Sequence, residues 1–415
     1  MKGEFTSMFQ NSMSLHDYYI IDHASPRVNP PIRPSPSLVS FEDDACNIIR
    51  ANYAIGQKKQ QSSPCSSWIN RDYECLPEIP LLYPIERTNT VVQCSDPHLI
   101  ADRIICSLQK LSITANFNAS DASLCAETLD HTEFYVRMYK YKNQDILVEV
   151  QRSKGESFNY VKYARVILAS ARGDEVDFET ENRKRSSSAS LSYIPASISC
   201  NQQDSDTYNE TEVSSVHHVE DLIQKDRVDA HQLGMHTLLL LTDCERSLVS
   251  ESASQVVLQG NENGPSVIKD FVYSLISGPL LNNTSSPCEV DVFAIREQEI
   301  MRNTALAVLG NSLQSVSESH PSDLKKLLHT NEWKGNSGIV DVLLSELSNA
   351  ECRLHDAYQA ARCIRILLET SSETKQELLN RNVAATLKDA YLIGVSKHSL
   401  LAAECKEALD LISGV

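Results

Sequence analysis

The segment from Phe134 to Leu168 changes its hydrophobic period once, and this change constrains the fold more than any other feature of the sequence. Apolar side chains alternate at Phe134, Val136 and Met138, which is the period of a half-buried strand. The same alternation returns over residues 146–150 after a short polar connection. We therefore expect an antiparallel hairpin of two strands.

Beyond Gly155 the spacing of the apolar residues becomes that of a helix. The residues that share this helical face are Tyr160, Tyr163, Ala164 and Ile167. Gly155 can adopt a positive φ at the turn between strand and helix, and the acidic Glu156 suits the positive end of the helix dipole. A helix is therefore expected to cover one face of the sheet.

Further strands and one more helix are expected upstream of this segment. Val91 and Val92 have the character of a strand, and Pro97 suits the first turn of a helix capped by Ser95 or Asp96. The predicted buried stripe of this helix consists of Leu99, Ile100, Ile104 and Leu108. Residues 114–118 and 124–128 are candidate second and third strands.

This order of elements resembles the kinase-associated-1 domain found at the C-terminus of microtubule-affinity-regulating and AMP-activated-type kinases. The residues that carry the resemblance are Val148, Glu149, Arg152, Gly155, Glu156, Ser157, Tyr160 and Lys162. It implies an α+β domain over residues 85–171, with an antiparallel sheet backed by two helices. It also implies two uses, which are contact with anionic phospholipid and docking on a kinase domain.

Both uses depend on surface residues, and the predicted hairpin and closing helix are rich in cations. These residues are Arg137, Lys140, Lys142, Arg152, Lys154, Lys162 and Arg165. Each Lys or Arg near an anionic membrane adds about 1 kcal/mol of attraction, so we take them as candidates for lipid or partner binding. The alternative is that they are ordinary solubilising residues beside Glu149 and Glu156.

Two segments are too polar or too broken by proline and serine to predict secondary structure. Residues 1–84 are expected to be a disordered tail, and residues 172–216 an acidic, serine-rich linker. In the linker, Ser186 and Ser188 each follow an arginine by three residues, a spacing that basophilic kinases prefer. We predict that both serines are phosphorylation sites.

Residues 217–415 are expected to be all-α. Four segments carry small residues and leucines at helical spacing, and the last two start 45 residues apart, which matches an armadillo/HEAT repeat of ~40–47 residues. The expected buried positions are Gly234, Thr237, Leu238, Leu241, Ala305, Val308, Leu309, Ser312, Ala360, Cys363, Ile364, Leu367, Cys405, Ala408, Leu409 and Ile412. This part resembles an armadillo array with polar insertions at 282–290 and 320–335, and Asn311 matches the asparagine of the family's groove.

Charge and motifs exclude several classes of function. The net charge of −17 argues against a nucleic-acid binder, because neutralising phosphates requires a basic surface. The 12 cysteines include no C-x-x-C pair, so they are read as reduced thiols. We find no catalytic or phosphate-binding motif, no metal-ligand spacing, no cofactor signature, no signal peptide and no membrane span.

The sequence therefore predicts a non-catalytic adaptor, cytoplasmic, with a peripheral membrane or nuclear location as alternatives. Its kinase-associated-1-like domain would contact anionic phospholipid, and its helical repeats would bind a protein partner. Two alternatives stay open: a regulatory subunit that docks on a protein kinase, and an enzyme whose site is not visible in the sequence.

Overall fold

The computed structural model describes Trp68 and residues 73–174, 176, 205–260, 266–278, 292–335 and 338–414. Most of the tail and linker segments, including Ser186 and Ser188, lie outside these residues. None of the described helices is both long and apolar enough to cross a membrane.

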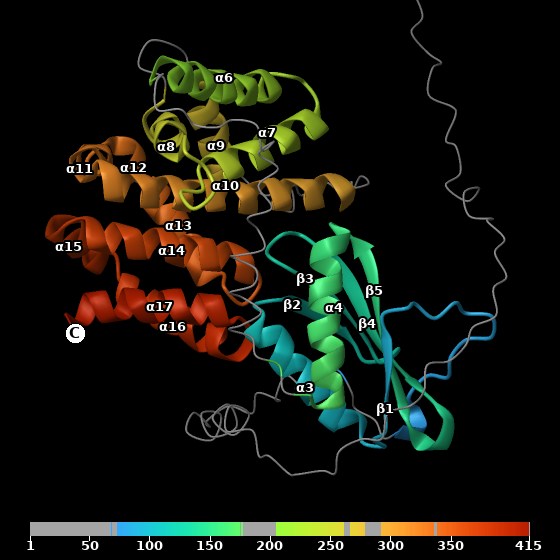
Figure 1. Ribbon diagram of the computed structural model, residues 1–415. Coiled ribbons are helices and arrows are strands. Elements are labelled where there is room, and N and C mark those ends of the chain that lie inside the picture. Colours follow the sequence, from blue (N-terminus) through green and yellow to red (C-terminus); the bar gives the residue numbers. More distant parts are fainter. Residues whose placement is uncertain are drawn as a thin grey trace, which may run out of the picture. The chain divides into compact units, whose positions relative to one another are not determined.

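The first folded part is an antiparallel sheet of five strands (Figure 1). The strands are β1 (Asn89–Val92), β2 (Thr114–Asn118), β3 (Ser123–Glu127), β4 (Glu133–Lys140) and β5 (Ile146–Lys154), in the spatial order β1-β5-β4-β3-β2. The predicted hairpin is the β4–β5 pair, in which Val136 faces Val150 and Met138 faces Val148. The antiparallel sheet and its hairpin are thus confirmed.

Helices α3 (Pro97–Lys110) and α4 (Ser157–Arg172) cover one face of the sheet (Figure 1). The Asp96 side chain caps α3 by accepting from the His98 N–H, and Ile100 and Ile104 are fully buried. Leu99, however, is 42% exposed, so its assignment to the buried stripe was wrong. Ala101 lies in the core instead, because the buried arc of α3 is turned by one residue from the predicted one.

Gly155 makes the turn between β5 and α4 as expected. Its φ is +89°, and a Cβ there would lie 2.6 Å from the Cα of Thr132, so both the backbone conformation and the close approach require glycine. Glu156 is the N-cap residue of α4, and its side chain makes no capping hydrogen bond.

Part of the second face of the sheet is covered by the chain that precedes β1, which we call the strap (residues 73–88, including η1, Tyr73–Cys75). Glu149 on β5 is fully buried beneath it and accepts hydrogen bonds from the Tyr83 hydroxyl at 3.0 Å and the Glu86 N–H at 2.6 Å. A carboxylate in a strand core is stable only when it is hydrogen-bonded. The strap is therefore part of the domain, and residues 73–84 are not a disordered tail.

The second folded part is all-α in the residues that the structure describes. Its helices are α6 (Ser205–Ile223), α7 (Val228–Leu241), α8 (Ser250–Gln259), α9 (Val267–Ser277), α10 (Val292–Ser319), α11 (Pro321–Leu328), α12 (Asn331–Lys334), α13 (Ile339–Ser348), α14 (Leu354–Thr370), α15 (Ser372–Asn380), α16 (Val383–Lys397) and α17 (Ser399–Ser413). Helix α6 begins inside the segment that was predicted as linker.

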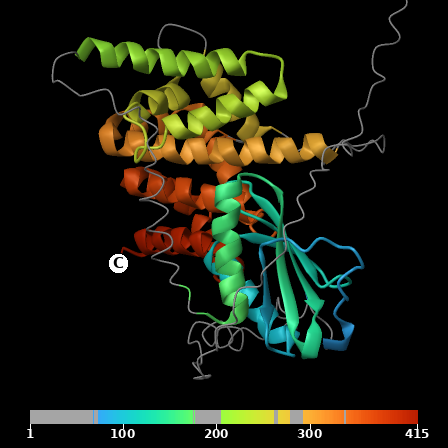
Figure 2. The same cartoon turned by 45° about the vertical axis from the view of Figure 1, so that its right-hand side comes forward.

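Two layers of helices enclose one hydrophobic core. Helices α7, α10, α14 and α17 pack in that order in one layer, which we call the inner layer, and α9, α13 and α16 pack in order in the other (Figure 1, Figure 2). Most of the expected buried positions lie between them, whereas Thr237, Leu241, Leu409 and Ile412 are only partly buried.

The segment 320–335, expected as a polar insertion, forms α11 and α12. Leu324, Leu328 and Trp333 are buried from these helices, so the segment belongs to the core and its prediction as an insertion was wrong. Its lysines and histidines face solvent. In the sequence they stand between the few apolar residues, so the helical apolar spacing is hard to recognise. The other expected insertion, 282–290, lies outside the described residues.

The strap generates a prediction about the limits of the sheet domain. A fragment of residues 68–176 is expected to melt cooperatively and at a higher temperature than a fragment of residues 85–171, because the shorter one leaves the Glu149 carboxylate without the Tyr83 hydroxyl. Thermal unfolding followed by circular dichroism measures the difference. Equal melting temperatures would show that the strap contributes nothing.

The helical core generates a second prediction. Ala360→Glu, at a position with no exposed surface, is expected to destabilise the protein by about 3 kcal/mol or more because it buries an unpaired charge. Leu367→Asp is expected to behave alike. Ala385→Glu, at an exposed position of α16, is the matched control and should cost little. Urea unfolding checks all three, and an Ala360→Glu protein as stable as the parent would contradict the described packing.

Candidate functional site

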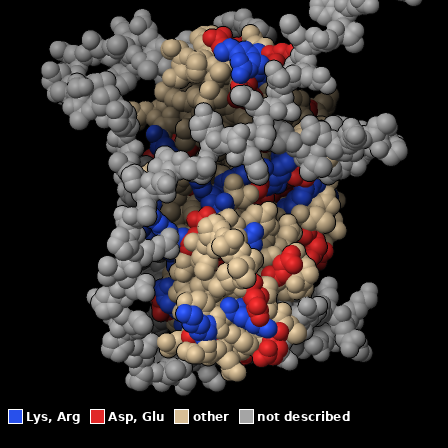
Figure 3. Space-filling view, turned by 90° about the vertical axis from the view of Figure 1, so that its right-hand side faces the viewer, with Lys and Arg blue, Asp and Glu red and all other residues tan. Residues whose placement is uncertain are grey.

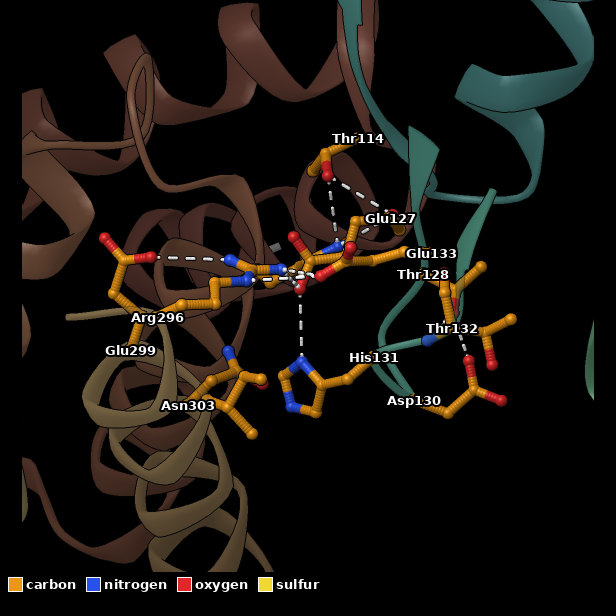
Figure 4. Close-up of polar contacts among 12 residues, drawn as sticks. Thr114, Glu127, Thr128, Asp130, His131, Thr132, Glu133, Arg296, Glu299 and Asn303 are labelled. Atoms are coloured by element: carbon orange, nitrogen blue, oxygen red, sulfur yellow. Dashed lines mark hydrogen bonds and ion pairs between the residues drawn. The ribbon is translucent and has the colours of Figure 1, made fainter. Parts of the chain in front are cut away.

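One arginine of the inner helical layer lies against the ends of strands β3 and β4, and we call this contact the junction. Glu127 ends β3 and faces Glu133, the first residue of β4, across the strand pair. Two carboxylates at facing positions repel each other. The guanidinium of Arg296 on α10 pairs with both, with 3.2 Å from Nη2 to the Glu133 Oε1, and so neutralises the repulsion (Figure 4).

The turn between β3 and β4 holds these carboxylates in place. The Thr128 Oγ1 accepts from the Thr132 N–H at 3.0 Å, and the Thr128 carbonyl accepts from the His131 N–H at 3.0 Å. Burial alone would raise the pKa of Glu127, but hydrogen bonds from His131 and Arg296 outweigh it and lower the pKa to about 2. Glu127 is therefore charged at neutral pH.

Two buried histidines connect the same strand end to helix α17. The His398 Nδ1 accepts from the Leu401 N–H at 3.1 Å, its Nε2 lies 3.1 Å from the Nδ1 of His355, and the His355 Nε2 lies 3.2 Å from the Glu127 carbonyl. A carbonyl can only accept, so His355 must donate through Nε2 and accept through Nδ1. His398 must then also donate through Nε2.

This chain of three hydrogen bonds, which we call the histidine relay, needs both rings neutral. A proton added at either Nδ1 would face an N–H donor and break a bond of the relay. Burial lowers the pKa of His355 to about 4 and the pKa of His398 to about 3, which agrees with the geometry.

Serine side chains complete the contact at α17. The Ser112 Oγ accepts from the Leu400 N–H at 2.9 Å, so a residue that follows α3 satisfies a free donor in the first turn of α17. The Ser399 hydroxyl donates to the Lys110 carbonyl at 2.9 Å. Arg296, His355 and Ser399 all lie in the first two turns of their helices, so the sheet domain meets the N-terminal ends of α10, α14 and α17.

Behind the junction, buried polar groups fix the helices to one another. The Asn303 amide donates to the Asp356 Oδ1 at 2.7 Å, and Glu346 on α13 pairs with Arg302 at 2.5 Å and Arg353 at 3.0 Å. Burial raises the pKa of Asp356 to about 6. These pairs set the register of α10, α13 and α14 against one another.

The structure does not gather the seven predicted basic residues into one patch. Lys140 is opposite Ile146, beside the hairpin turn that contains Lys142 (η2, Lys142–Gln144), whereas Arg152 is opposite Phe134 near the other end of the strand pair. Six residues of strand separate the two ends, which is about 20 Å. Lys140 and Lys142 are therefore remote from Arg152 and Lys154.

Two of the seven residues contact the strap. Arg137 donates to the Tyr83 hydroxyl at 3.3 Å and lies 4.9 Å above the Tyr135 ring, and Lys140 is 3.6 Å from Glu74. On the face drawn in Figure 3, Lys and Arg alternate with Asp and Glu over the described residues. This surface has no large area of a single sign.

Four of the seven residues lie close to one exposed stripe of α4. Phe158, Lys162 and Arg165 recur at helical spacing along it, and Phe158 is 78% exposed. Arg152 and Lys154 stand at the end of β5 next to the first turn of this helix, where the Arg152 guanidinium donates to the Gly155 carbonyl. We call these five residues the α4 stripe.

The predicted groove residue Asn311 lies on a partly exposed stripe of the inner layer. Between residues 302 and 316 of α10 only Asn311 and Gln314 are not buried, and between residues 355 and 368 of α14 only Tyr358, Arg362 and Arg365 are not buried. We call these five residues the α10–α14 stripe. The Asn311 amide is engaged within the fold, because its Nδ2 is 3.4 Å from the Leu239 carbonyl and its Oδ1 accepts from Arg362 at 2.8 Å.

Sequence reasoning missed the residues of the junction. Arg296 is separated from Glu133 by more than 160 positions, and no spacing pattern connects them. One signal was available: His355 and His398 each stand at the start of a strongly apolar helix, where a buried polar side chain has to find a partner.

Comparisons with known proteins found no matching family model, no matching curated protein and no matching solved structure. Within the described ranges, no group of three or more His, Cys, Asp or Glu side chains is arranged to hold a metal ion.

The relay generates a prediction about pH. Unfolded histidine binds protons below about pH 6.5, but His398 in the fold resists protonation until about pH 3. The unfolded state therefore gains protons first, and stability falls as the pH drops through this window, by up to about 1.4 kcal/mol per pH unit for one histidine. His398→Asn, which keeps a helix-capping residue, is expected to lose less stability between pH 6.5 and 4.

Urea unfolding of the two proteins at several pH values measures this difference. Asp356 titrates in the opposite sense, because its pKa in the fold is raised to about 6, but it is present in both proteins and cancels. Identical pH dependence in the parent and in His398→Asn would contradict the relay.

Proposed function

We propose that the protein is a non-catalytic scaffold, with a kinase-associated-1-like domain that contacts anionic phospholipid and an armadillo-like helical array that binds a protein partner. The observation that carries the proposal is that each folded part has a stripe of side chains that are exposed or partly exposed on its surface. These are the α4 stripe and the α10–α14 stripe.

The composition of the α4 stripe supports contact with a membrane surface. It combines four cations with one exposed aromatic ring, and Lys154, Lys162 and Arg165 have no carboxylate partner among the described residues. Each such cation contributes about 1 kcal/mol of attraction to an anionic leaflet, and Phe158 can insert at the interface. Arg137, Lys140 and Lys142 do not belong to this contact.

The order of the helices supports the armadillo-like array. In each of three groups, shorter helices precede two that pack together: α8 precedes α9 and α10, α11 and α12 precede α13 and α14, and α15 precedes α16 and α17. Helix α14 starts at Leu354 and α17 at Ser399, 45 residues later, which lies within the length of an armadillo or HEAT repeat, ~40–47 residues. Stacked repeats of this kind present a continuous surface to a partner.

A specific observation favours a second candidate, docking on a protein kinase as a regulatory subunit. Leu81 and Leu82 project from the strap and are 93% and 96% exposed. The turn that carries them is held by the Tyr83 N–H, which donates to the Pro80 carbonyl, and by the Tyr83 hydroxyl on Glu149. Two leucines held outward by a fixed turn suit an apolar pocket on another protein.

Charge-matched variants test the lipid contact. Lys162→Ser with Arg165→Ser is expected to reduce sedimentation of the protein with phosphatidylserine vesicles severalfold, because both cations stand on the α4 stripe. Lys140→Ser with Lys142→Ser removes the same charge at the far end of the hairpin and should have little effect. Added salt should weaken binding of the parent, since exposed charges are screened within about 8 Å at physiological ionic strength.

Two outcomes would contradict this account. An equal loss in both double variants would mean that net charge, and not the α4 stripe, governs vesicle binding. If the parent does not sediment with these vesicles even at low salt, the lipid contact is absent, and kinase docking through Leu81 and Leu82 becomes the better explanation of the domain.

A further inference from the structure

One arginine of the helical part differs from all the others that the structure describes there. Seven arginines have at least one carboxylate within 4 Å, and they are Arg227, Arg246, Arg296, Arg302, Arg353, Arg365 and Arg381. Arg362 has none. Its one described polar partner is the neutral amide oxygen of Asn311, at 2.8 Å.

Arg362 lies in the middle of the α10–α14 stripe, partly buried between two helices. Its guanidinium passes over Gly310, where an added Cβ would lie 3.4 Å from the Arg362 Nη1. The Asn311 amide therefore holds the Nη1 end of the guanidinium, and the backbone of α10 at Gly310 lies next to the same atom. The group is oriented before any ligand arrives.

An oriented guanidinium without a counter-ion is unusual in a chain of net charge −17. Its next neighbour on the stripe, Arg365, pairs with Glu369, Glu404 and Glu407. Arginine has five N–H donors in a planar fork that matches a carboxylate, and Asn311 accepts from one of them. The remaining donors are available to an anion from outside.

We propose that Arg362, oriented by Asn311, anchors an acidic side chain of a peptide segment that lies along the α10–α14 stripe. The inference rests on the proposed protein-binding role of the helical array and adds the chemistry of the partner. The peptide carboxylate would pair with the free edge of the guanidinium, which is the interaction that every other described arginine of this part makes within the fold.

The surroundings of Arg362 also predict which peptide residues flank the acidic residue that it would bind. On one side, the Asn311 amide reaches the Leu239 carbonyl of α7, and the following residue, Leu240, is 54% exposed. On the other side, Glu404 and Glu407 of α17 would repel a second acidic group. We therefore expect an acidic residue with an apolar neighbour toward α7 and no further acidic residue toward α17.

Selection from a random peptide library displayed against the full-length protein tests the proposal. Enriched peptides are expected to share an Asp or Glu next to a bulky apolar residue. Arg362→Gln is expected to weaken binding of these peptides roughly tenfold or more, because a hydrogen bond to a charged group contributes about 1.5–3 kcal/mol. Its melting temperature should stay close to that of the parent, since Arg362 forms no ion pair with the described part of the chain.

Two further variants make the test specific. Arg165→Gln removes the same charge from the α4 stripe and should leave peptide binding unchanged. Asn311→Asp places a carboxylate on Arg362 from within the protein, so it should keep the fold while weakening peptide binding at least as much as Arg362→Gln.

Each result supports or overturns one of the two claims. Peptides that are enriched without an acidic residue, or that bind the Arg362→Gln protein as well as the parent, would overturn the anchor and leave protein binding standing. If no peptide is enriched, both the anchor and the protein-binding role of the helical array fail. Acidic peptides lost in Arg165→Gln but retained in Arg362→Gln would assign the anion site to α4 and overturn the proposal.

Discussion

A repulsion built into the sheet is the constraint on which the arrangement of the chain depends. The register of β3 and β4 places Glu127 directly opposite Glu133, so the sheet domain by itself holds two carboxylates at one strand end. Helix α10 supplies Arg296 to that point. Arg296 pairs with these two carboxylates only when the helical part is docked on the sheet. This gives the two parts a physical reason to form one unit.

The histidine relay adds directionality to this contact. Ion pairs tolerate small displacements, but the relay requires a free N–H on α17, two rings in one tautomer and a carbonyl at the end of β3, all in line. The Ser112 hydroxyl on the next N–H of α17 fixes the position further. Because polar groups without partners are costly when buried, a shifted docking position would leave several of them unsatisfied.

The α4 stripe and the α10–α14 stripe lie outside the residues that form the junction. The junction uses the helix ends of the inner layer and the ends of β3 and β4, whereas the α4 stripe lies on α4 and the end of β5 and the α10–α14 stripe lies along helix bodies. In the proposed scaffold, one docked unit would hold a membrane surface and a protein partner at a fixed separation.

Local features of the fold could be predicted from the sequence, because they depend on neighbours along the chain. The alternation at Phe134 and Val136, the turn at Gly155 and the helical faces around Leu238 and Ile364 are of this kind. The exposure of Leu99 could not be predicted, because the sheet decides which arc of α3 is covered. The role of Glu149 depends on a strap more than 60 residues away.

The candidate site was predicted less well, for a related reason. The basic residues were grouped by their proximity in sequence. In a hairpin, however, residues beside the turn and residues at the open end lie at opposite ends of the strand pair. The register alone would have separated Lys142 from Lys154. Asn311 was identified from a repeat pattern, but its contact with Arg362 joins two helices and leaves no periodic signal.

The most direct test of this account is a double-mutant cycle between Glu127→Gln and Arg296→Gln, measured as free energies of unfolding of the full chain. The two positions lie in different folded parts, so a coupling free energy arises only if the parts are docked as described. The account predicts a favourable coupling of about 1 kcal/mol or more. A coupling indistinguishable from zero, with both single variants folded, would contradict it.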